Sequence, residues 1–73
     1  MMPAGVLFGM TRDEVVSAIG EPDAKGASSQ KYPTPACYLY GHIELHFEPW
    51  KAGRFVFWMD ARTHHGERMP HAV

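Results

Sequence analysis

The sequence lacks the features by which many small proteins are cross-linked or anchored to a membrane. Its 73 residues include one cysteine, Cys37, so no disulfide can form within the monomer. A single cysteine favours a reducing compartment. No apolar run approaches the roughly 20 residues that span a bilayer, and the start lacks the basic region and long apolar stretch of a signal peptide. We therefore expect a cytoplasmic protein that does not contact a membrane.

The chain also lacks a surplus of charge of either sign. Seven Lys and Arg residues and eight Asp and Glu residues leave a formal net charge of −1 with histidine neutral. Nucleic-acid-binding domains usually carry a strong positive field, so we expect no nucleic-acid partner. Apolar residues make up 45% of the chain, which is typical of a globular domain. Because so short a chain buries a small core, a partner protein or a second copy is an available source of stability.

A complete set of helix boundary signals lies between residues 11 and 20. Thr11 and Glu14 have the spacing of a capping box, in which each side chain accepts a hydrogen bond from the other residue's backbone amide. The apolar residues that follow recur at helical spacing. Gly20 suits the position after the last helical residue, and Pro22 cannot continue the helix. The sequence therefore predicts a short helix that packing must stabilise.

Alternating apolar and polar residues replace the helical spacing in the second half of the chain. Residues 43–47 and 54–60 alternate in this way, which is typical of half-buried strands. A third apolar segment, 37–40, precedes Gly41-His42, and glycine in the first central position suits a type II′ hairpin. We therefore expect an α+β fold, with one short helix packed on an antiparallel β-meander of three or four strands.

The length of the chain allows one domain, residues 1–73. Residues 21–35 contain prolines, glycine and small polar residues, which favour a loop. The expected organisation is a lead-in (1–10), the helix (11–20), a loop (21–35), antiparallel strands (36–60) and a polar tail (61–73).

Strand register decides which side chains face the helix. The core closes if Phe47 pairs with Phe55, Leu45 with Phe57 and Ile43 with Met59, all toward the helix. A two-residue hairpin loop would then put Cys37 and Leu39 on the opposite face, whereas a three-residue loop would put Leu39 in the core. Both alternatives leave Trp58 opposite the helix, on a face too apolar for simple solvent contact.

Side chains on that face, together with a loop tryptophan, are the candidates for binding a partner. Trp50 follows Pro49 in the expected loop between the last two strands, and exposed tryptophans are enriched at binding hot spots. The alternative for both tryptophans is local packing against the tail or the loop 21–35. The candidate partner-binding residues are Leu39, Glu44, His46, Trp50, Val56 and Trp58.

Cys37, His46 and Glu44 are the residues that raise the question of catalysis. With a two-residue hairpin loop they are neighbours on the sheet, and a Cys–His–carboxylate set can generate a reactive thiolate. The alternative is that three adjacent residues share a surface, since no oxyanion hole or helix N-terminus is placed beside Cys37. We therefore expect no catalytic residues.

Five histidines raise the question of a metal site. His42 and His46 lie four residues apart on an expected strand, about 13 Å along it, so they cannot bind one ion together. His64, His65 and His71 lie in the tail, where solvated histidines are the simpler interpretation. We expect no metal and no cofactor.

Two segments resemble known families. Residues 9–15 (GMTRDEV), followed by residues 20–23 (GEPD), resemble the start of the small-protein-A and outer-membrane lipoprotein group, which is similar in fold to the β-lactamase inhibitor proteins. Residues 40–47 (YGHIELHF) are similar to a hairpin of many small bacterial proteins, including immunity proteins linked to polymorphic toxins. The resemblance implies a helical layer against a curved antiparallel sheet and a protein partner.

Together these observations favour a small non-catalytic protein-binding module, in the class of immunity or inhibitor proteins that occlude a partner protein. The first alternative is a homo-oligomeric structural module, in which the apolar face or a sheet edge is buried against a second copy. The second alternative is a thiol enzyme that uses Cys37.

Overall fold

The computed structural model describes residues 5–70; residues 1–4 of the expected lead-in and 71–73 of the expected tail lie outside the described residues. The elements are α1 (Arg12–Ile19), β1 (Ala24–Gly26), β2 (Cys37–Tyr40), β3 (Ile43–Phe47), β4 (Phe55–Asp60) and β5 (Gly66–Arg68). The strands pair antiparallel in the order β1-β2-β3-β4-β5. The expected α+β class with an antiparallel sheet is confirmed, but the sheet has five strands rather than three or four.

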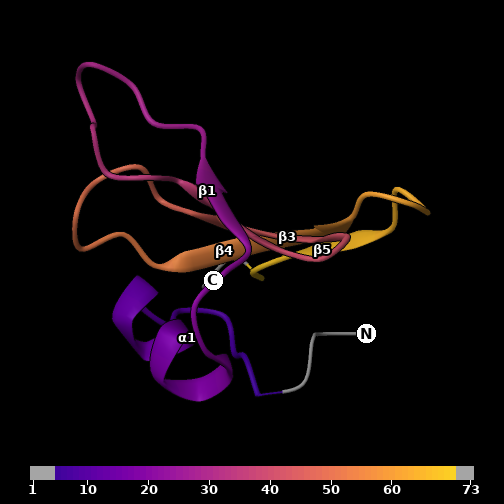
Figure 1. Cartoon of the computed structure of the whole chain (residues 1–73). Helices are drawn as coiled ribbons and strands as arrows, with labels where there is room; N and C mark the ends of the chain where they lie inside the picture. The colour runs from indigo at the N-terminus through magenta and orange to yellow at the C-terminus, as the bar shows by residue number, and fades with distance from the viewer. Residues whose placement is uncertain (1–4, 71–73) are drawn as a thin grey trace.

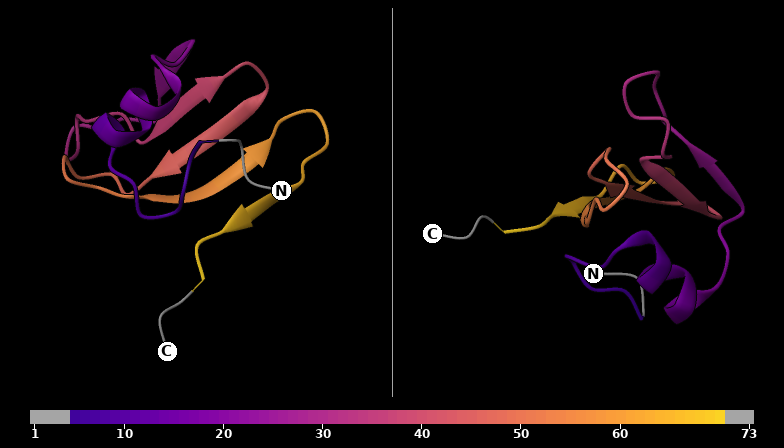
Figure 2. Two further views of the ribbon diagram at one scale, coloured as in Figure 1. Left: turned by 90° about the horizontal axis from the view of Figure 1, so that it is seen from below. Right: turned by 90° about the vertical axis from the view of Figure 1, so that its left-hand side faces the viewer.

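The fold has two layers, because α1 and the segment 5–11 lie on the same side of the sheet (Figure 1). The two further views in Figure 2 show the same arrangement. We call the side of the sheet toward α1 the helix face and the opposite side the outer face. In the described part of the chain, no helix combines the length and the apolar character needed to cross a bilayer.

The boundary signals of α1 act as predicted. The Thr11 hydroxyl accepts a hydrogen bond from the Glu14 N–H at 3.2 Å, and Glu14 Oε1 accepts one from the Thr11 N–H at 2.9 Å. These two hydrogen bonds hold the pKa of Glu14 below its usual value, and the bond from the Thr11 backbone N–H has the larger effect. At the other end, the Gly20 N–H donates to the Val16 carbonyl at 2.8 Å. Val15 is fully buried and anchors the helix to the sheet.

The hairpin between β2 and β3 has the two-residue loop Gly41-His42. Gly41 takes φ +62°, the left-handed region that glycine enters without strain. Tyr38 consequently lies opposite Leu45 on the helix face. The two-residue alternative is thereby confirmed, and the three-residue alternative is excluded.

Strands β1 and β5 occupy segments that were expected to be loop and tail. Each is three residues long, too short to show an alternating pattern, so neither could be recognised from periodicity. Next to β1, the Asp23 carboxylate accepts a hydrogen bond from the Gly41 N–H at 2.6 Å. Beyond β5, the Met69 N–H donates to the Val56 carbonyl at 2.7 Å. Pairing with a longer neighbour therefore defines both edge strands.

The register between β3 and β4 shifts at a β-bulge. Phe47 pairs with Phe55 as expected, but Leu45 lies opposite Trp58. Because the bulge adds one residue to β4, every later side chain changes face relative to the prediction. The other two expected pairs, Leu45–Phe57 and Ile43–Met59, are wrong.

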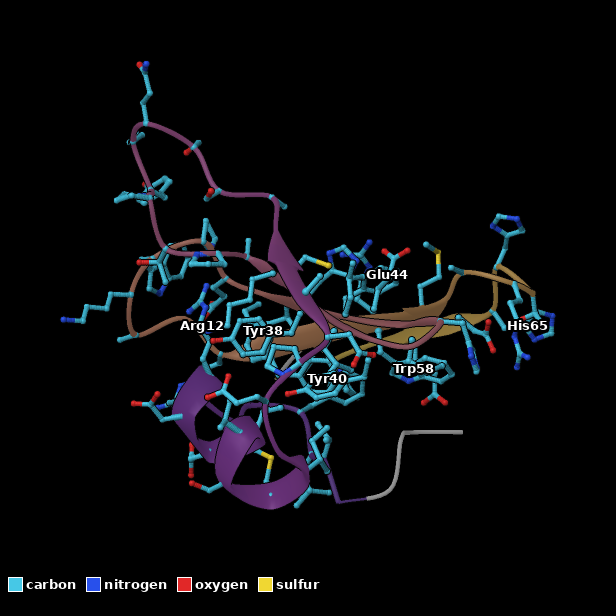
Figure 3. The ribbon with its side chains drawn as sticks, viewed as in Figure 1. Arg12, Tyr38, Tyr40, Glu44, Trp58 and His65 are labelled. Atoms are coloured by element: carbon cyan, nitrogen blue, oxygen red, sulfur yellow. The ribbon has the colours of Figure 1, made fainter. Side chains whose placement is uncertain are left out.

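Trp58 consequently lies on the helix face and not, as predicted, on the outer face (Figure 3). Its side chain is 6% exposed and belongs to the core. Among the described residues, its indole N–H has no hydrogen-bond partner. Phe57 and Met59, which were expected in the core, lie on the outer face instead.

The core fills the space between the helix face and the layer formed by α1 and its lead-in. Phe47 connects two aromatic contacts, with ring centroids 5.0 Å from Tyr38 and 5.9 Å from Phe55. The buried cluster consists of Val6, Val15, Tyr38, Leu45, Phe47, Phe55 and Trp58.

Arg12 is buried although it is charged, and it joins the start of α1 to two loops. Its guanidinium lies over the Phe47 ring, 5.1 Å from the centroid. Burial lowers the pKa of Arg12. The guanidinium donates hydrogen bonds at 2.6–3.4 Å to the backbone carbonyls of Pro35, Glu48, Trp50, Lys51 and Gly53.

Candidate binding surface

The outer face carries two rows of residues that cross all five strands. Directly opposed residues of antiparallel neighbours point to the same face, so the pairing register defines each row. The first row is Gly26, Cys37, His46, Phe57 and Arg68. The second row is Ala24, Leu39, Glu44, Met59 and Gly66. Glu44 points away from the helix in Figure 3 and marks this face.

The first row is a chain of contacts centred on His46. The His46 ring lies 5.2 Å from the Phe57 ring, measured between centroids. On the far side of Phe57, the Arg68 guanidinium lies 5.1 Å from the ring centroid, within the range of a cation–π interaction. His46 also lies directly opposite Cys37. An aromatic pair and a cation therefore occupy one half of the outer face.

A polar cluster joins the two rows at the centre of the sheet. His46 Nε2 lies 3.0 Å from Glu44 Oε1 and 3.9 Å from Cys37 Sγ. The side chains of His46 and Glu44 are 32% and 24% exposed, whereas Cys37 is buried. The expected adjacency of these three residues is confirmed by the register.

Apolar side chains surround this cluster. Leu39 and Met59 lie on either side of Glu44 in the second row, and Phe57 lies beside His46 in the first. All three are half-buried by their neighbours within the sheet. In the part of the chain that the structure describes, neither α1 nor a second sheet covers them (Figure 2).

The structure brings together half of the six predicted binding residues. Leu39, Glu44 and His46 are neighbours on the outer face, as expected. Val56 is the residue that the bulge adds to β4, and it is half-buried. Trp58 is in the core, so its expected place on the binding surface was wrong.

Trp50 lies in the loop 48–53, away from the outer rows. Its side chain is 47% exposed, and its ring makes an edge contact with Tyr32, with centroids 6.4 Å apart. The predicted exposure of Trp50 is therefore found, together with the local packing against the 21–35 segment that was the alternative.

Phe57 and Met59 are members of the outer face that the sequence pattern missed. Residues 55–59 are all large and apolar, so alternation alone assigns no face to them. A bulge in such a run leaves no compositional mark. The polar residues Glu44 and His46 mark the outer face on β3, but they do not determine which residues of β4 lie opposite them.

The surroundings of Cys37 oppose formation of a thiolate. Burial raises the pKa of the Cys37 thiol, and the nearby Glu44 carboxylate raises it further. Nucleophilic cysteines depend on the opposite shift, which populates the thiolate at neutral pH. The arrangement therefore favours a protonated thiol beside His46.

A recess of about 520 Å³ lies where α1 begins. Its wall includes Arg12, but the guanidinium is already surrounded by backbone carbonyls and is not available to a bound anion. The recess is lined by Thr11, Arg12, Asp13, Thr34, Tyr38, Lys51 and Ala52. It offers no convergent set of reactive groups, and the outer face is the stronger candidate.

Comparison with known proteins finds no match for this chain among protein-family models, curated proteins or solved structures.

Proposed function

We propose that this protein is a small non-catalytic binding module that docks on another protein through its outer face. The supporting observation is the group formed by Leu39, Phe57 and Met59 on the side of the sheet that α1 leaves uncovered. An antiparallel sheet with one solvated face normally carries polar residues there. Leu39, Phe57 and Met59 are partly exposed apolar side chains on an uncovered sheet face, and such side chains support an interaction surface.

The chemistry of the outer face suits a selective contact. Its centre holds a carboxylate and an imidazole, and Arg68 at the β5 edge adds a positive charge over an aromatic ring. Interfaces commonly combine an apolar centre with aromatic and arginine side chains. A partner that covers the face must supply apolar groups together with donors for the Glu44 carboxylate.

The proposed mode of action is occlusion. The module has a rigid sheet and, in this proposal, no chemistry of its own, so it acts by covering a surface of its partner. The resemblance of residues 40–47 to immunity-type hairpins supports an immunity or inhibitor role. The single cysteine favours a cytoplasmic setting.

A photo-crosslinking experiment in native host cells tests the proposal. We replace Met59 with a photoreactive phenylalanine analogue and expect one discrete adduct with a different polypeptide. A second substitution, Leu39→Ser, should abolish that adduct. The matched control places the analogue at Leu7, which is 68% exposed on the segment before α1, and should give no such adduct.

Each other result contradicts the proposal in a distinct way. An adduct of twice the chain mass, with dimers in sedimentation at micromolar concentration, would instead support the homo-oligomeric module. Absence of any adduct, or equal adducts from positions 7 and 59, would refute docking through the outer face.

A further inference from the structure

The polar cluster on the outer face combines a thiol, an imidazole and a carboxylate. One ligand atom from each of Cys37, His46 and Glu44 lies within 4.8 Å of the ligand atoms of the other two. Sulfur, nitrogen and oxygen ligands of these types are the ones that bind Zn²⁺ in proteins. The spacing of histidines along the chain does not reveal this set, because Cys37 and His46 come from two paired strands.

We propose that Cys37, His46 and Glu44 form a zinc site with one open coordination position. Tetrahedral coordination at the usual bond lengths of about 2.0–2.3 Å separates neighbouring ligand atoms by about 3.3–3.8 Å. His46 Nε2 lies 3.9 Å from the Cys37 sulfur and 3.0 Å from the Glu44 oxygen. Both differ from the tetrahedral value by a few tenths of an ångström.

The backbone explains why these three atoms converge. Cys37 and His46 are directly paired across β2 and β3, and Glu44 lies two residues before His46 on the same face of β3. All three positions belong to the central hairpin, whose register is held by the Gly41-His42 turn. The pairing of β2 and β3 therefore sets the backbone positions of all three ligands, and metal binding requires only side-chain adjustments.

The burial of the three ligands differs in a way that suits an ion arriving from solvent. Cys37 is 7% exposed and lies deepest, while the His46 and Glu44 side chains are partly exposed and can rotate. The ion would replace the present contact between His46 and Glu44, and the thiol would release its proton. Three protein ligands leave the fourth position to water or to a ligand from outside.

Cobalt titration of the untagged protein, kept reduced and first stripped with a chelator, tests the proposal. Co²⁺ occupies tetrahedral zinc sites and is coloured. We expect one equivalent to produce thiolate-to-metal charge-transfer absorption in the near ultraviolet and d–d bands in the visible range. One equivalent of Zn²⁺ should bleach both. This readout concerns metal binding alone, so it can fail while docking through the outer face stands.

Variants assign the ligands. Cys37→Ser should abolish the charge-transfer band, His46→Ala should abolish binding, and Glu44→Gln should weaken it at least tenfold. His64→Ala/His65→Ala is the matched control, because these histidines are exposed and distant in sequence from the cluster, and it should titrate like the wild type. Circular dichroism verifies that each variant is folded.

Nitrogen-detected NMR of the wild-type histidine rings keeps the test independent of the variants. Zn²⁺ should shift the His46 signals and leave those of His64 and His65 unchanged. The proposal is overturned if the wild type shows no charge-transfer band, if Cys37→Ser retains it, or if only the signals of His64 and His65 respond.

Discussion

At the scale of single residues, Arg12 makes more long-range hydrogen bonds than its position on a short surface helix suggests. A guanidinium group offers five N–H donors in a fixed planar arrangement. In this fold those donors bond to carbonyls of the loop 48–53 and of Pro35, at sites that are part-buried or buried. The charge is stabilised by backbone dipoles and by the face of Phe47.

Arg12→Lys should destabilise the protein even though it keeps the positive charge. Lysine has three donors on one nitrogen and cannot reach all the carbonyls that lie around the edge of the guanidinium. Each buried carbonyl left without a partner costs about 1–3 kcal/mol, so we expect a loss of about 2–4 kcal/mol in the free energy of unfolding, measured by urea titration.

Arg54→Lys is the matched control for Arg12→Lys. Arg54 is exposed, and its guanidinium donates to a single carbonyl, that of Gly9, at 2.9 Å. Such a surface change should alter the free energy of unfolding by no more than about 0.5 kcal/mol. Equal losses in the two lysine variants would show that Arg12 has no special part in the fold.

The role of Arg12 could not be read from the sequence. The nearby residues Thr11 and Glu14 predict the start of a helix through their spacing, and that prediction is confirmed. The acceptors of Arg12 lie 23 to 41 residues away. No local pattern encodes contacts of that kind, because they depend on how the loops return to the helix.

At the scale of elements, β5 is held by a close approach of its backbone to β4. A Cβ atom placed on Gly66 would collide with the Trp58 carbonyl oxygen and would lie 3.1 Å from the Met59 Cα. Gly26 is a suitable comparison, because it belongs to the opposite edge strand, and a Cβ placed there meets nothing within 4 Å.

Gly66→Ala should therefore destabilise the protein, whereas Gly26→Ala should not. Forcing an atom into an occupied space typically costs about 1–3 kcal/mol, and we expect a loss of that size for Gly66→Ala in urea titration. Gly26→Ala should lie between no change and a gain of about 1 kcal/mol, since alanine reduces the freedom of the unfolded chain. Equal effects at both edges would contradict the observed packing of β5.

The elements that sequence patterns predicted are those with a local cause. The capping box predicted α1, and Gly41 predicted the two-residue hairpin as one of two alternatives. Strands β1 and β5 were missed because three residues hold no period, and the bulge in β4 was missed because its neighbours are uniformly apolar. The bulge had the largest consequence for the candidate site, because it places Trp58 on the helix face and Phe57 and Met59 on the outer face.

At the scale of the whole molecule, the two faces of the sheet carry different kinds of side chains. The helix face is filled by the core, whereas the outer face keeps half-buried apolar side chains around a polar cluster. The sequence predicted that one face would be left over and named Leu39, Glu44 and His46 on it. It could not name the complete surface, because membership depends on the register of a bulged strand.

The small core also implies that the layers cannot unfold separately. A helix of eight residues is marginal without tertiary contacts, and Arg12 connects its first turn to the loop 48–53. We therefore expect a single cooperative transition that involves the helix, the sheet and this loop.

The two tryptophans make this prediction measurable, because Trp58 reports on the core and Trp50 on the loop. Trp50→Phe leaves the core reporter, and Trp58→Phe leaves the loop reporter while removing an indole N–H that lacks a described partner. In each variant, fluorescence and far-ultraviolet circular dichroism should give the same urea midpoint. If Trp50 fluorescence changes at lower urea than the dichroism of the same variant, the loop opens before the core. Arg12 would then not couple the two layers.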